Sequence, residues 1–271
     1  MGESLSILGQ SLYFRGENVK SPASLKKAGF SFNINFVMRK KKKALVLFSG
    51  GIDSTTALFW ARGRYGEVTA LSFDYGQRHK VELALARRLT RRLRLAHRVL
   101  KVDLRPVGGS ALTDASIPVP DPGGAGDPAK GIPVTYVPFR NGIFLALATA
   151  WAESKGLDDL ICGFNTIDSP AYPDTRPSFV RAMQRAVDAG TGAVAGGRRI
   201  RIVAPFARMK KSEIIRLGLS FGADYSLSIS CYRGREVPCR RCSSCRLRKR
   251  AWEEAGTEDP LLVRLRKEGK I

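Results

Sequence analysis

Short apolar runs alternate with amphipathic segments from residue 44 onward. The runs are nearly continuous in apolar residues, which is typical of strands buried on both faces, and they cover 44–48, 68–73, 99–104, 160–163 and 200–203. Between them, apolar residues recur every three or four positions and predict helices over 54–64, 79–95, 141–155, 178–189 and 212–217. This alternation predicts an α/β fold with a doubly wound parallel sheet.

Two segments lack this pattern. Residues 105–138 are rich in proline and glycine and predict a long loop, which in a compact domain is more often functional than idle. Residues 1–37 show no strong periodicity and no apolar core of a signal peptide. We expect a disordered extension there, or a natural start at Met38.

The loop after the first predicted strand carries two glycines and four hydroxyl side chains. Because it joins a buried strand to a helix, unpaired N–H groups there face an incoming anion, and glycine lets a ligand approach closely. Asp53 suits either the helix N-cap or a cation that accompanies phosphate. The loop lacks the Gly-x-x-x-x-Gly-Lys of a Walker-type site, and a Gly-Gly turn can also be purely structural.

Composition excludes some classes and adds an unusual charge. The apolar fraction of 44% and the charged fraction of 26% are ordinary for a globular protein and exclude wholesale disorder. No apolar run approaches the roughly 20 residues of a membrane-spanning helix. The net charge of +22 is concentrated in segments 1–43, 87–101 and 231–250. These basic segments suit phosphates or nucleic acid, or they form solvated faces.

Four of the five cysteines form a cluster near the C-terminus: Cys231, Cys239, Cys242 and Cys245. Cysteines spaced this closely, without a secretory signal, favour a metal site in a reducing compartment over disulfides. Four thiolates leave no coordination position for water, which favours structural zinc, with an iron–sulfur cluster as the rival. Cys162, in an apolar segment, is expected to be a buried small side chain.

The loop and the cysteine cluster together resemble the 7-cyano-7-deazaguanine synthase family of pyrophosphate-loop ATP pyrophosphatases. The loop residues 49–54 match the signature Ser-Gly-Gly-x-Asp-Ser. Further matching segments follow in order between about residues 43 and 259, at 74–79, 137–141, 172–177, 211, 217–218 and 224–232.

The resemblance implies a fold, a reaction and partners. It implies an adenine nucleotide alpha hydrolase-like catalytic domain over 38–228 and a zinc-binding segment, a four-cysteine knuckle, over 229–271. The implied reaction converts 7-carboxy-7-deazaguanine and ammonia to the nitrile, using ATP, through adenylation and an amide, in queuosine biosynthesis. It also implies Mg²⁺ with ATP, one structural Zn²⁺ per chain, a cytoplasmic homodimer, and no direct binding of tRNA or membrane.

Site residues follow from the same resemblance. The implied ATP-binding residues are Phe48, Ser49, Gly50, Gly51, Ile52, Asp53, Ser54, Thr55, Thr56, Ala57 and Leu58. The catalytic candidates are Asp53, Lys211 and Arg140. Asp53 would hold a cation that offsets phosphate charge, whereas Lys211, Arg140 and Mg²⁺ would neutralise the phosphates and the developing negative charge. A deazaguanine offers N–H donors, which suit a carboxylate, and its own carboxylate, which suits arginine. The candidates for its pocket are Asp168, Tyr172, Asp174 and Arg176.

The sequence departs from the family pattern in two places. The usual Cys-Gly-x-Cys is here Cys239-Arg240-Arg241-Cys242, and the usual Asp-Cys-Arg-Pro-Glu is here residues 174–178, Asp-Thr-Arg-Pro-Ser. Two other functions stay open. A pyrophosphate-loop enzyme acting on tRNA, such as a lysidine synthase or a thiolase, would explain the basic segments. A non-enzymatic zinc-ribbon nucleic-acid binder would leave loop 49–54, called the phosphate loop below, unused.

Overall fold

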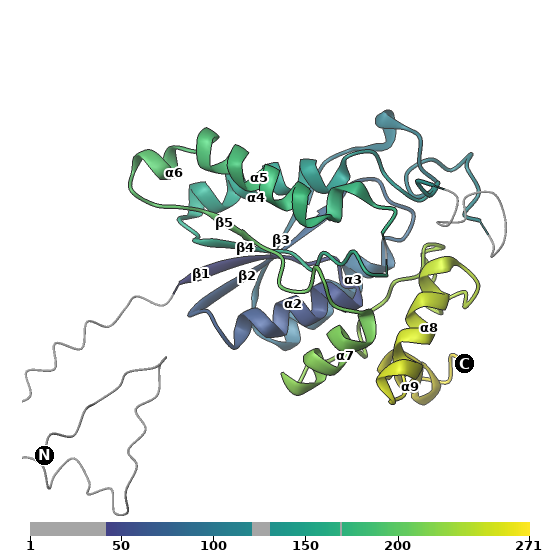
Figure 1. Cartoon of the computed structure of the whole chain (residues 1–271). Coiled ribbons are helices and arrows are strands. Elements are labelled where there is room, and N and C mark those ends of the chain that lie inside the picture. Colours follow the sequence, from purple (N-terminus) through teal and green to yellow (C-terminus); the bar gives the residue numbers. More distant parts are fainter. Residues whose placement is uncertain (1–41, 121–130, 169) are drawn as a thin grey trace, which may run out of the picture. The chain divides into compact units, whose positions relative to one another are not determined.

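Five parallel strands form one sheet in the computed structural model, which describes residues 42–120, 131–168 and 170–271 (Figure 1). The strands are β1 (Lys43–Leu47), β2 (Glu67–Asp74), β3 (Ala96–Lys101), β4 (Asp159–Ile161) and β5 (Arg201–Val203). Their order across the sheet is β3-β2-β1-β4-β5, and every neighbouring pair is parallel. The order reverses at β1, so the first loop lies where such sheets bind ligands.

Helices cover both faces of this sheet, which confirms the doubly wound fold. One face carries α2 (Ile52–Arg62), α3 (Val81–Arg92) and α7 (Lys211–Ser220). The other carries α4 (Arg140–Lys155), α5 (Pro177–Gly190) and the short α6 (Gly192–Ala195) (Figure 1). Two helices end the chain, α8 (Ser243–Ala255) and α9 (Pro260–Lys267).

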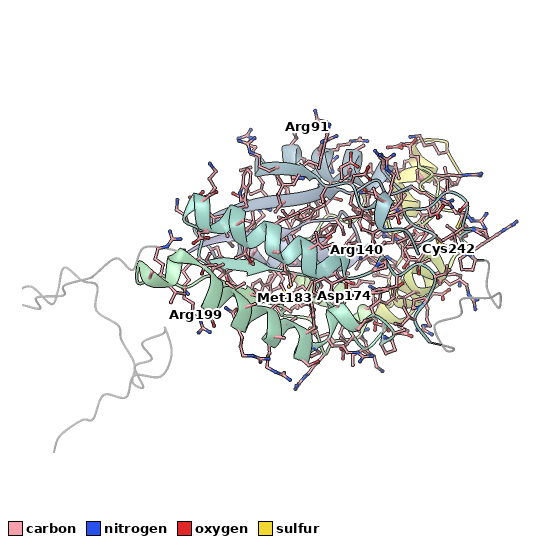
Figure 2. The ribbon with its side chains drawn as sticks, turned by 90° about the horizontal axis from the view of Figure 1, so that it is seen from above. Arg91, Arg140, Asp174, Met183, Arg199 and Cys242 are labelled. Carbon is pink, nitrogen blue, oxygen red and sulfur yellow. The ribbon has the colours of Figure 1, made fainter. Side chains whose placement is uncertain are left out.

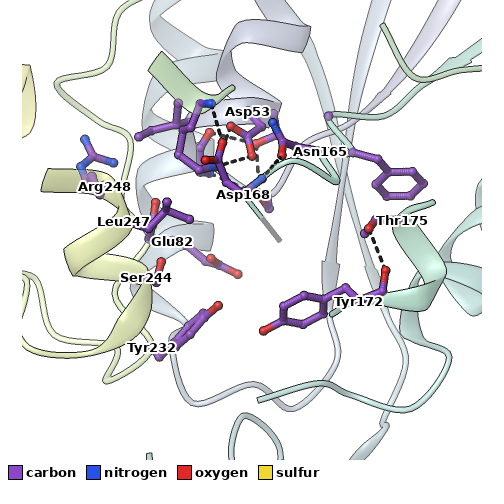
Figure 3. A pocket seen from close by; sticks show the side chains of 18 of the residues that line it. Asp53, Glu82, Asn165, Asp168, Tyr172, Thr175, Tyr232, Ser244, Leu247 and Arg248 are labelled. Carbon is purple, nitrogen blue, oxygen red and sulfur yellow. Dashed lines mark hydrogen bonds and ion pairs between the residues drawn. The ribbon is translucent and has the colours of Figure 1, made fainter. Parts of the chain in front are cut away.

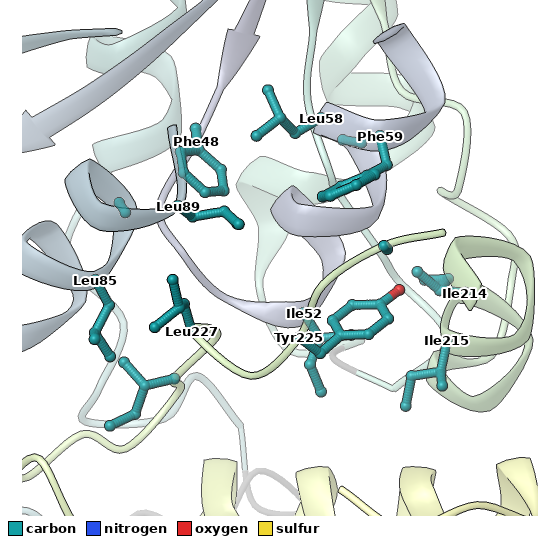
Figure 4. Packing of buried hydrophobic residues seen from close by; sticks show 14 of the residues in the cluster. Phe48, Ile52, Leu58, Phe59, Leu85, Leu89, Ile214, Ile215, Tyr225 and Leu227 are labelled. Carbon is teal, nitrogen blue, oxygen red and sulfur yellow. The ribbon is translucent and has the colours of Figure 1, made fainter. Parts of the chain in front are cut away.

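The central strand divides its side chains between two apolar clusters. Ala44 and Val46 pack with α2 and α3, whereas Leu45 packs with the α4 side, and all three are completely buried. Because both faces of β1 are covered, its sequence is a continuous apolar run rather than an alternating one. Figure 4 shows the first cluster beneath the phosphate loop, where Phe48 and Ile52 meet side chains of α3 and α7.

The third strand differs from the sequence prediction. It was expected over 99–104, but its ladder with β2 runs from Thr69↔Ala96 to Asp74↔Lys101. Val102 and Leu104 lie beyond the end of the ladder but still pack against the core. Because they are apolar, the sequence pattern placed the end of the strand too far toward the C-terminus. The bounds of the other predicted elements agree with the structure within three residues.

Some expectations fall on residues outside the described part of the chain. The expected extension over 1–37 and the start at Met38 lie there, as do residues 121–130 of the long loop. The described parts of that loop contain one short 3-10 helix, η2 (Arg105–Val107), and turns. The domain boundary between residues 228 and 229 stays a prediction. Within the described ranges, every helix is too short or too polar to cross a bilayer.

Candidate functional site

A cavity of about 890 Å³ opens at the carboxyl ends of β1, β2 and β4 (Figure 3). Its walls include Ser49 after β1, Tyr75 after β2 and Gly163 after β4, together with side chains of α3, α4, α7 and α8. Thr135 and Pro120 of the long loop also line it, which supports a functional role for that loop. Parallel sheets bind ligands at this edge because loops from several strands converge there.

The phosphate loop forms one end of the cavity. Gly50 has a φ of +85°, a conformation in which a side chain would be strained, and this turns the chain from β1 into α2. Gly51 is the N-cap of α2 and gives no side-chain cap, so N–H groups of the first turn keep their capacity to bind an anion. The hydroxyl groups of Ser49 and Ser54 lie 3.1 Å apart beside this turn.

Only part of the predicted ATP-binding run faces the cavity. The residues that line it are Phe48, Ser49, Gly51, Ile52, Asp53 and Ser54. Thr56 instead bonds to the Tyr225 hydroxyl at 2.6 Å, while Ala57 and Leu58 are completely buried in the apolar cluster. The Thr55 hydroxyl is buried without a hydrogen-bond partner among the described residues. The second half of the run therefore supports α2.

Gly163 allows β4 to approach the phosphate loop. A Cβ at this position would lie 2.8 Å from the carbonyl carbon of Asp53 and 2.9 Å from the Ser54 nitrogen. Both atoms belong to the backbone, so they cannot move aside as a flexible side chain would. Glycine is therefore required here for the two loops to meet.

Lys211 and Asp53 meet at the phosphate end. The Lys211 Nζ lies 2.9 and 2.6 Å from the two carboxylate oxygens of Asp53. The backbone N–H of Lys211, at the start of α7, donates to Asp168 Oδ2 at 2.5 Å, and the Asp168 N–H donates to Asn165 Oδ1 at 3.0 Å. A cation and two carboxylates thus line the same end of the cavity, as phosphate binding with a divalent cation requires.

The other end of the cavity is aromatic. Tyr75, Phe144, Tyr172 and Tyr232 all line it. Arg140 lies over the rings of Tyr75 and Phe144, at 5.5 and 5.9 Å, and donates from Nη1 to the Tyr75 hydroxyl at 3.0 Å. Its Nε has no hydrogen-bond partner in the described part of the chain. Arg140 therefore lines the same cavity as Lys211 and Asp53, but its hydrogen bond is to Tyr75 at the aromatic end.

Two buried titratable side chains, His79 and Glu82, belong to this aromatic end. The sequence analysis did not identify Glu82 as a site residue. His79 Nε2 lies 3.4 Å from Glu82 Oε1, and both residues line the cavity. Burial lowers the pKa of His79 to about 4, with a further contribution from the Arg140 charge, and burial raises the pKa of Glu82 to about 8. A single acid near the start of an amphipathic helix resembles an ordinary first-turn acid, so the sequence carries no distinguishing signal.

The four residues expected to bind the deazaguanine fall into two groups in the structure. Asp168 and Tyr172 line the cavity, and the Tyr172 hydroxyl lies 2.9 Å from Thr135 Oγ1. Asp174 and Arg176 are not among the lining residues. Asp174 is 3% exposed and accepts the backbone N–H of Asn141 at 3.0 Å, in the first turn of α4 (Figure 2). It therefore anchors the helix that carries Arg140.

Replacing Asp174 by alanine should lower the free energy of unfolding by about 1–2 kcal/mol, because α4 loses an acceptor for its first turn. Urea denaturation of the purified protein measures this. Arg176→Ala is the control, since Arg176 is exposed and its guanidinium donates to the Pro170 carbonyl at 3.3 Å. Unchanged stability together with a raised KM for a deazaguanine would instead place Asp174 at the substrate.

The basic segments of the sequence lie in different places. The arginines of 87–101 are exposed on α3 and the edge strand β3, where Arg91 is labelled in Figure 2. By contrast, Arg246, Lys249 and Arg250 of α8 line the cavity. Part of the positive charge is thus available to an anionic ligand of the cavity, and part faces solvent.

The four clustered cysteines fit a metal ion. Their sulfur atoms all lie within 4.8 Å of one another, and Cys239 Sγ lies 3.9 Å from Cys245 Sγ. Four sulfurs about 2.3 Å from a tetrahedral zinc ion would be about 3.8 Å apart, so the donor set and spacing agree. Backbone N–H groups of Cys239 and Cys242 donate to Cys231 Sγ and Cys239 Sγ at 3.3 Å, so these sulfur atoms already accept hydrogen bonds from the turn.

The cysteine cluster is joined to the phosphate loop by a backbone hydrogen bond. Ile229, two residues before Cys231, donates its N–H to the Gly50 carbonyl at 3.0 Å. Arg248 of α8 is 4% exposed; it bonds to Asp259 at 2.6 and 2.8 Å and to Ser228 Oγ at 3.3 Å. Damage to the cysteine cluster should therefore reach the nucleotide end of the cavity.

Arg240 occupies a left-handed position in the cysteine turn, with a φ of +59°. A residue with a side chain pays about 1–2 kcal/mol of strain in this conformation, which glycine avoids. Glycine loses more backbone entropy on folding, and this offsets only part of the gain. Arg240→Gly should therefore raise the free energy of unfolding by about 0.5–1 kcal/mol in thermal or urea denaturation. Arg241→Gly is the matched control and should lower it, since Arg241 is exposed but is not among the positive-φ residues.

Comparison with known proteins identifies relatives over most of the chain. Residues 43–256 match the family model of queuosine biosynthesis protein QueC. A 7-cyano-7-deazaguanine synthase of Anaeromyxobacter sp. (strain Fw109-5) is 52% identical over 228 residues, covering 83% of this chain and 97% of that protein. The enzyme of the same name from Azotobacter vinelandii is 47% identical, covering 81% of this chain and 97% of that protein.

Proposed function

The chain belongs to the QueC family of queuosine biosynthesis proteins, and we propose that it converts 7-carboxy-7-deazaguanine and ammonia to 7-cyano-7-deazaguanine with ATP. One observation carries this proposal beyond family membership. The phosphate loop with its Lys211–Asp53 pair and the aromatic end with Arg140 line a single cavity. An adenylate and a planar carboxylated base would therefore meet inside it.

The reaction needs two activations. A carboxylate is a poor electrophile at neutral pH, and its adenylation releases pyrophosphate and provides AMP as a leaving group. Ammonia displaces AMP to give an amide. A second ATP then adenylates the amide oxygen, and loss of AMP with that oxygen, together with protons from nitrogen, leaves the nitrile. The protein contributes positioning and charge neutralisation.

The side chains divide these tasks according to their place in the cavity. Lys211 is the candidate for the α- and β-phosphates, because its ammonium group lies at the phosphate loop. Arg140 is the candidate for the substrate carboxylate, because it lies against the aromatic rings. Mg²⁺ would accompany ATP, and the carboxylates of Asp53 and Asp168 are oxygen donors of the kind that it prefers.

The cysteine cluster holds a structural zinc ion in this proposal. Four thiolates close the coordination sphere, so the ion has no open position at which to activate water. Its contribution is folding energy for the segment that contacts the phosphate loop. The homodimer, the cytoplasmic location and the use of free ammonia remain proposals that follow from the family.

One assay separates the proposed function from its alternatives. Purified protein is incubated with ATP, ammonia and either 7-carboxy-7-deazaguanine or bulk tRNA, and nitrile, AMP and modified nucleosides are measured. We expect nitrile and AMP with the deazaguanine only. AMP formation that depends on tRNA would indicate a tRNA-modifying enzyme, and tRNA binding without AMP formation would indicate a nucleic-acid binder.

A further inference from the structure

Four acidic side chains line the cavity within the described residues, and Glu82 differs from the other three. Asp53 pairs with the Lys211 ammonium group, and Asp168 accepts the Lys211 N–H. Glu253 pairs with Lys249. Glu82 instead lies 3.4 Å from His79, whose imidazole is neutral at pH 7 because burial lowers its pKa to about 4, and it also interacts with the Gln77 side chain and with the more distant charge of Arg140. Glu82 is thus not neutralised by a neighbouring lysine.

Glu82 is buried yet faces the cavity. The residue is only 8% exposed, and Figure 3 shows its carboxyl group pointing toward the space between Tyr232 and Tyr172. Its backbone lies close to the phosphate loop, since a Cβ on Gly50 would lie 3.1 Å from the Glu82 carbonyl oxygen. A carboxyl group that faces this aromatic compartment can accept hydrogen bonds from a ligand with N–H donors.

Glu82 and Arg140 stand at opposite ends of one chain of polar contacts. Arg140 Nη1 lies 3.0 Å from the Tyr75 hydroxyl, which lies 3.4 Å from His79 Nε2, and His79 Nε2 lies 3.4 Å from Glu82 Oε1. The compartment therefore holds both a cation and a carboxyl group, which are connected through the rings of Tyr75 and His79. This suits a planar ligand with an anion at one end and N–H donors at the other.

We propose that Glu82 is the specificity-determining residue that accepts the N1–H and 2-amino donors of the deazaguanine, while Arg140 faces its carboxylate. The proposal rests on the proposed function, and it gives Glu82 the role that the sequence analysis offered to the carboxylates of Asp168 and Asp174. Burial raises the pKa of Glu82 to about 8 in the free protein, and two N–H donors of a bound base favour its ionised form.

The test compares two ligands in wild-type protein and in Glu82→Gln. The ligands are 7-carboxy-7-deazaguanine and its analogue that lacks the 2-amino group. In Glu82→Gln one acceptor becomes a donor that faces the donors of the base, so KM for the deazaguanine should rise about 10- to 100-fold. The wild type should prefer the 2-amino ligand, and in Glu82→Gln this preference should fall to within about threefold. KM for ATP should differ between the two proteins by less than about threefold.

Two further variants serve as controls for Glu82→Gln. Glu67→Gln removes an exposed carboxylate at the start of β2 that pairs with Lys43, and should leave all constants unchanged. Glu82→Asp keeps the acceptors but withdraws them by one methylene, so it should raise KM for the deazaguanine while retaining the preference for the 2-amino ligand. It also provides a second test should Glu82→Gln fail to fold.

The outcomes distinguish this proposal from the proposed function. If wild-type protein forms no nitrile, the proposed function itself fails. If the wild type forms nitrile but the Glu82 variants keep wild-type KM and ligand preference, only the assignment of Glu82 fails. A fall in kcat at unchanged KM, or an equal rise in KM for ATP, would likewise overturn the assignment.

Discussion

Lys211→Met should lower kcat/KM for ATP about 10²- to 10³-fold. The Lys211 ammonium group lies within 2.9 Å of both Asp53 oxygens at the rim of the phosphate loop, and its side chain is only 14% exposed. A preorganised cation that faces developing phosphate charge in a partly enclosed site is worth several kcal/mol to the transition state. AMP release at saturating deazaguanine and ammonia measures the effect.

The neighbouring lysine provides the control. Lys210 precedes α7, and its side chain is exposed, so Lys210→Met should leave ATP turnover near the wild-type rate. Asp53→Ala should act in the same direction as Lys211→Met, since it removes the carboxylate from the loop and leaves the lysine without its partner. ATP turnover within about threefold of wild type in both Lys211→Met and Asp53→Ala would refute the phosphate-loop assignment.

Cys242→Ser should abolish metal binding and leave poorly soluble protein. Loss of one of four thiolates removes most of the folding energy of such a centre, on the order of 10 kcal/mol. Cys242 is completely buried at the N-cap of α8, so α8 loses its anchor as well as the metal. Metal analysis of wild-type protein should find about one zinc per chain in a colourless preparation.

The effect should extend to ATP binding, because Ile229 links the cysteine segment to the Gly50 carbonyl. Removal of zinc from wild-type protein by a chelator should therefore weaken ATP binding before the sheet unfolds. Cys162→Ser is the control: Cys162 is buried outside the cluster, and its variant should keep its zinc. A brown preparation containing iron and labile sulfide would exclude zinc.

Much of the fold was predictable from local pattern. The continuous apolar run at β1, buried by helices on both faces, distinguishes a parallel sheet from an antiparallel one, and the strand order follows the expected doubly wound arrangement. Edge strand β3 was displaced because pairing with β2 ends before the apolar residues do. The helices α6, α8 and α9 were not among the predicted elements: α6 and α9 have only four and eight residues, and α8 carries few apolar residues, so each gives little periodic signal.

The candidate site was predictable where chemistry is contiguous in sequence. The phosphate loop and the cysteine cluster each lie within a short segment, so backbone geometry alone brings their groups together. Lys211 was found by resemblance, yet its contact with Asp53 spans 158 residues and exists only because α7 packs against α2. Such contacts are decided by the packing of elements and leave no trace in local spacing.

The sequence by itself determined the fold class and located the glycine-rich loop and the cysteine cluster, because apolar periodicity, a glycine turn and closely spaced thiols act over a few residues. Only the tertiary structure decided which side chains face the aromatic end of the cavity. It turned Asp174 back onto the first turn of α4 and brought Glu82 from α3 into the cavity. Both are single carboxylates near helix starts, and whether such a group caps a helix or meets a ligand depends on which elements surround it.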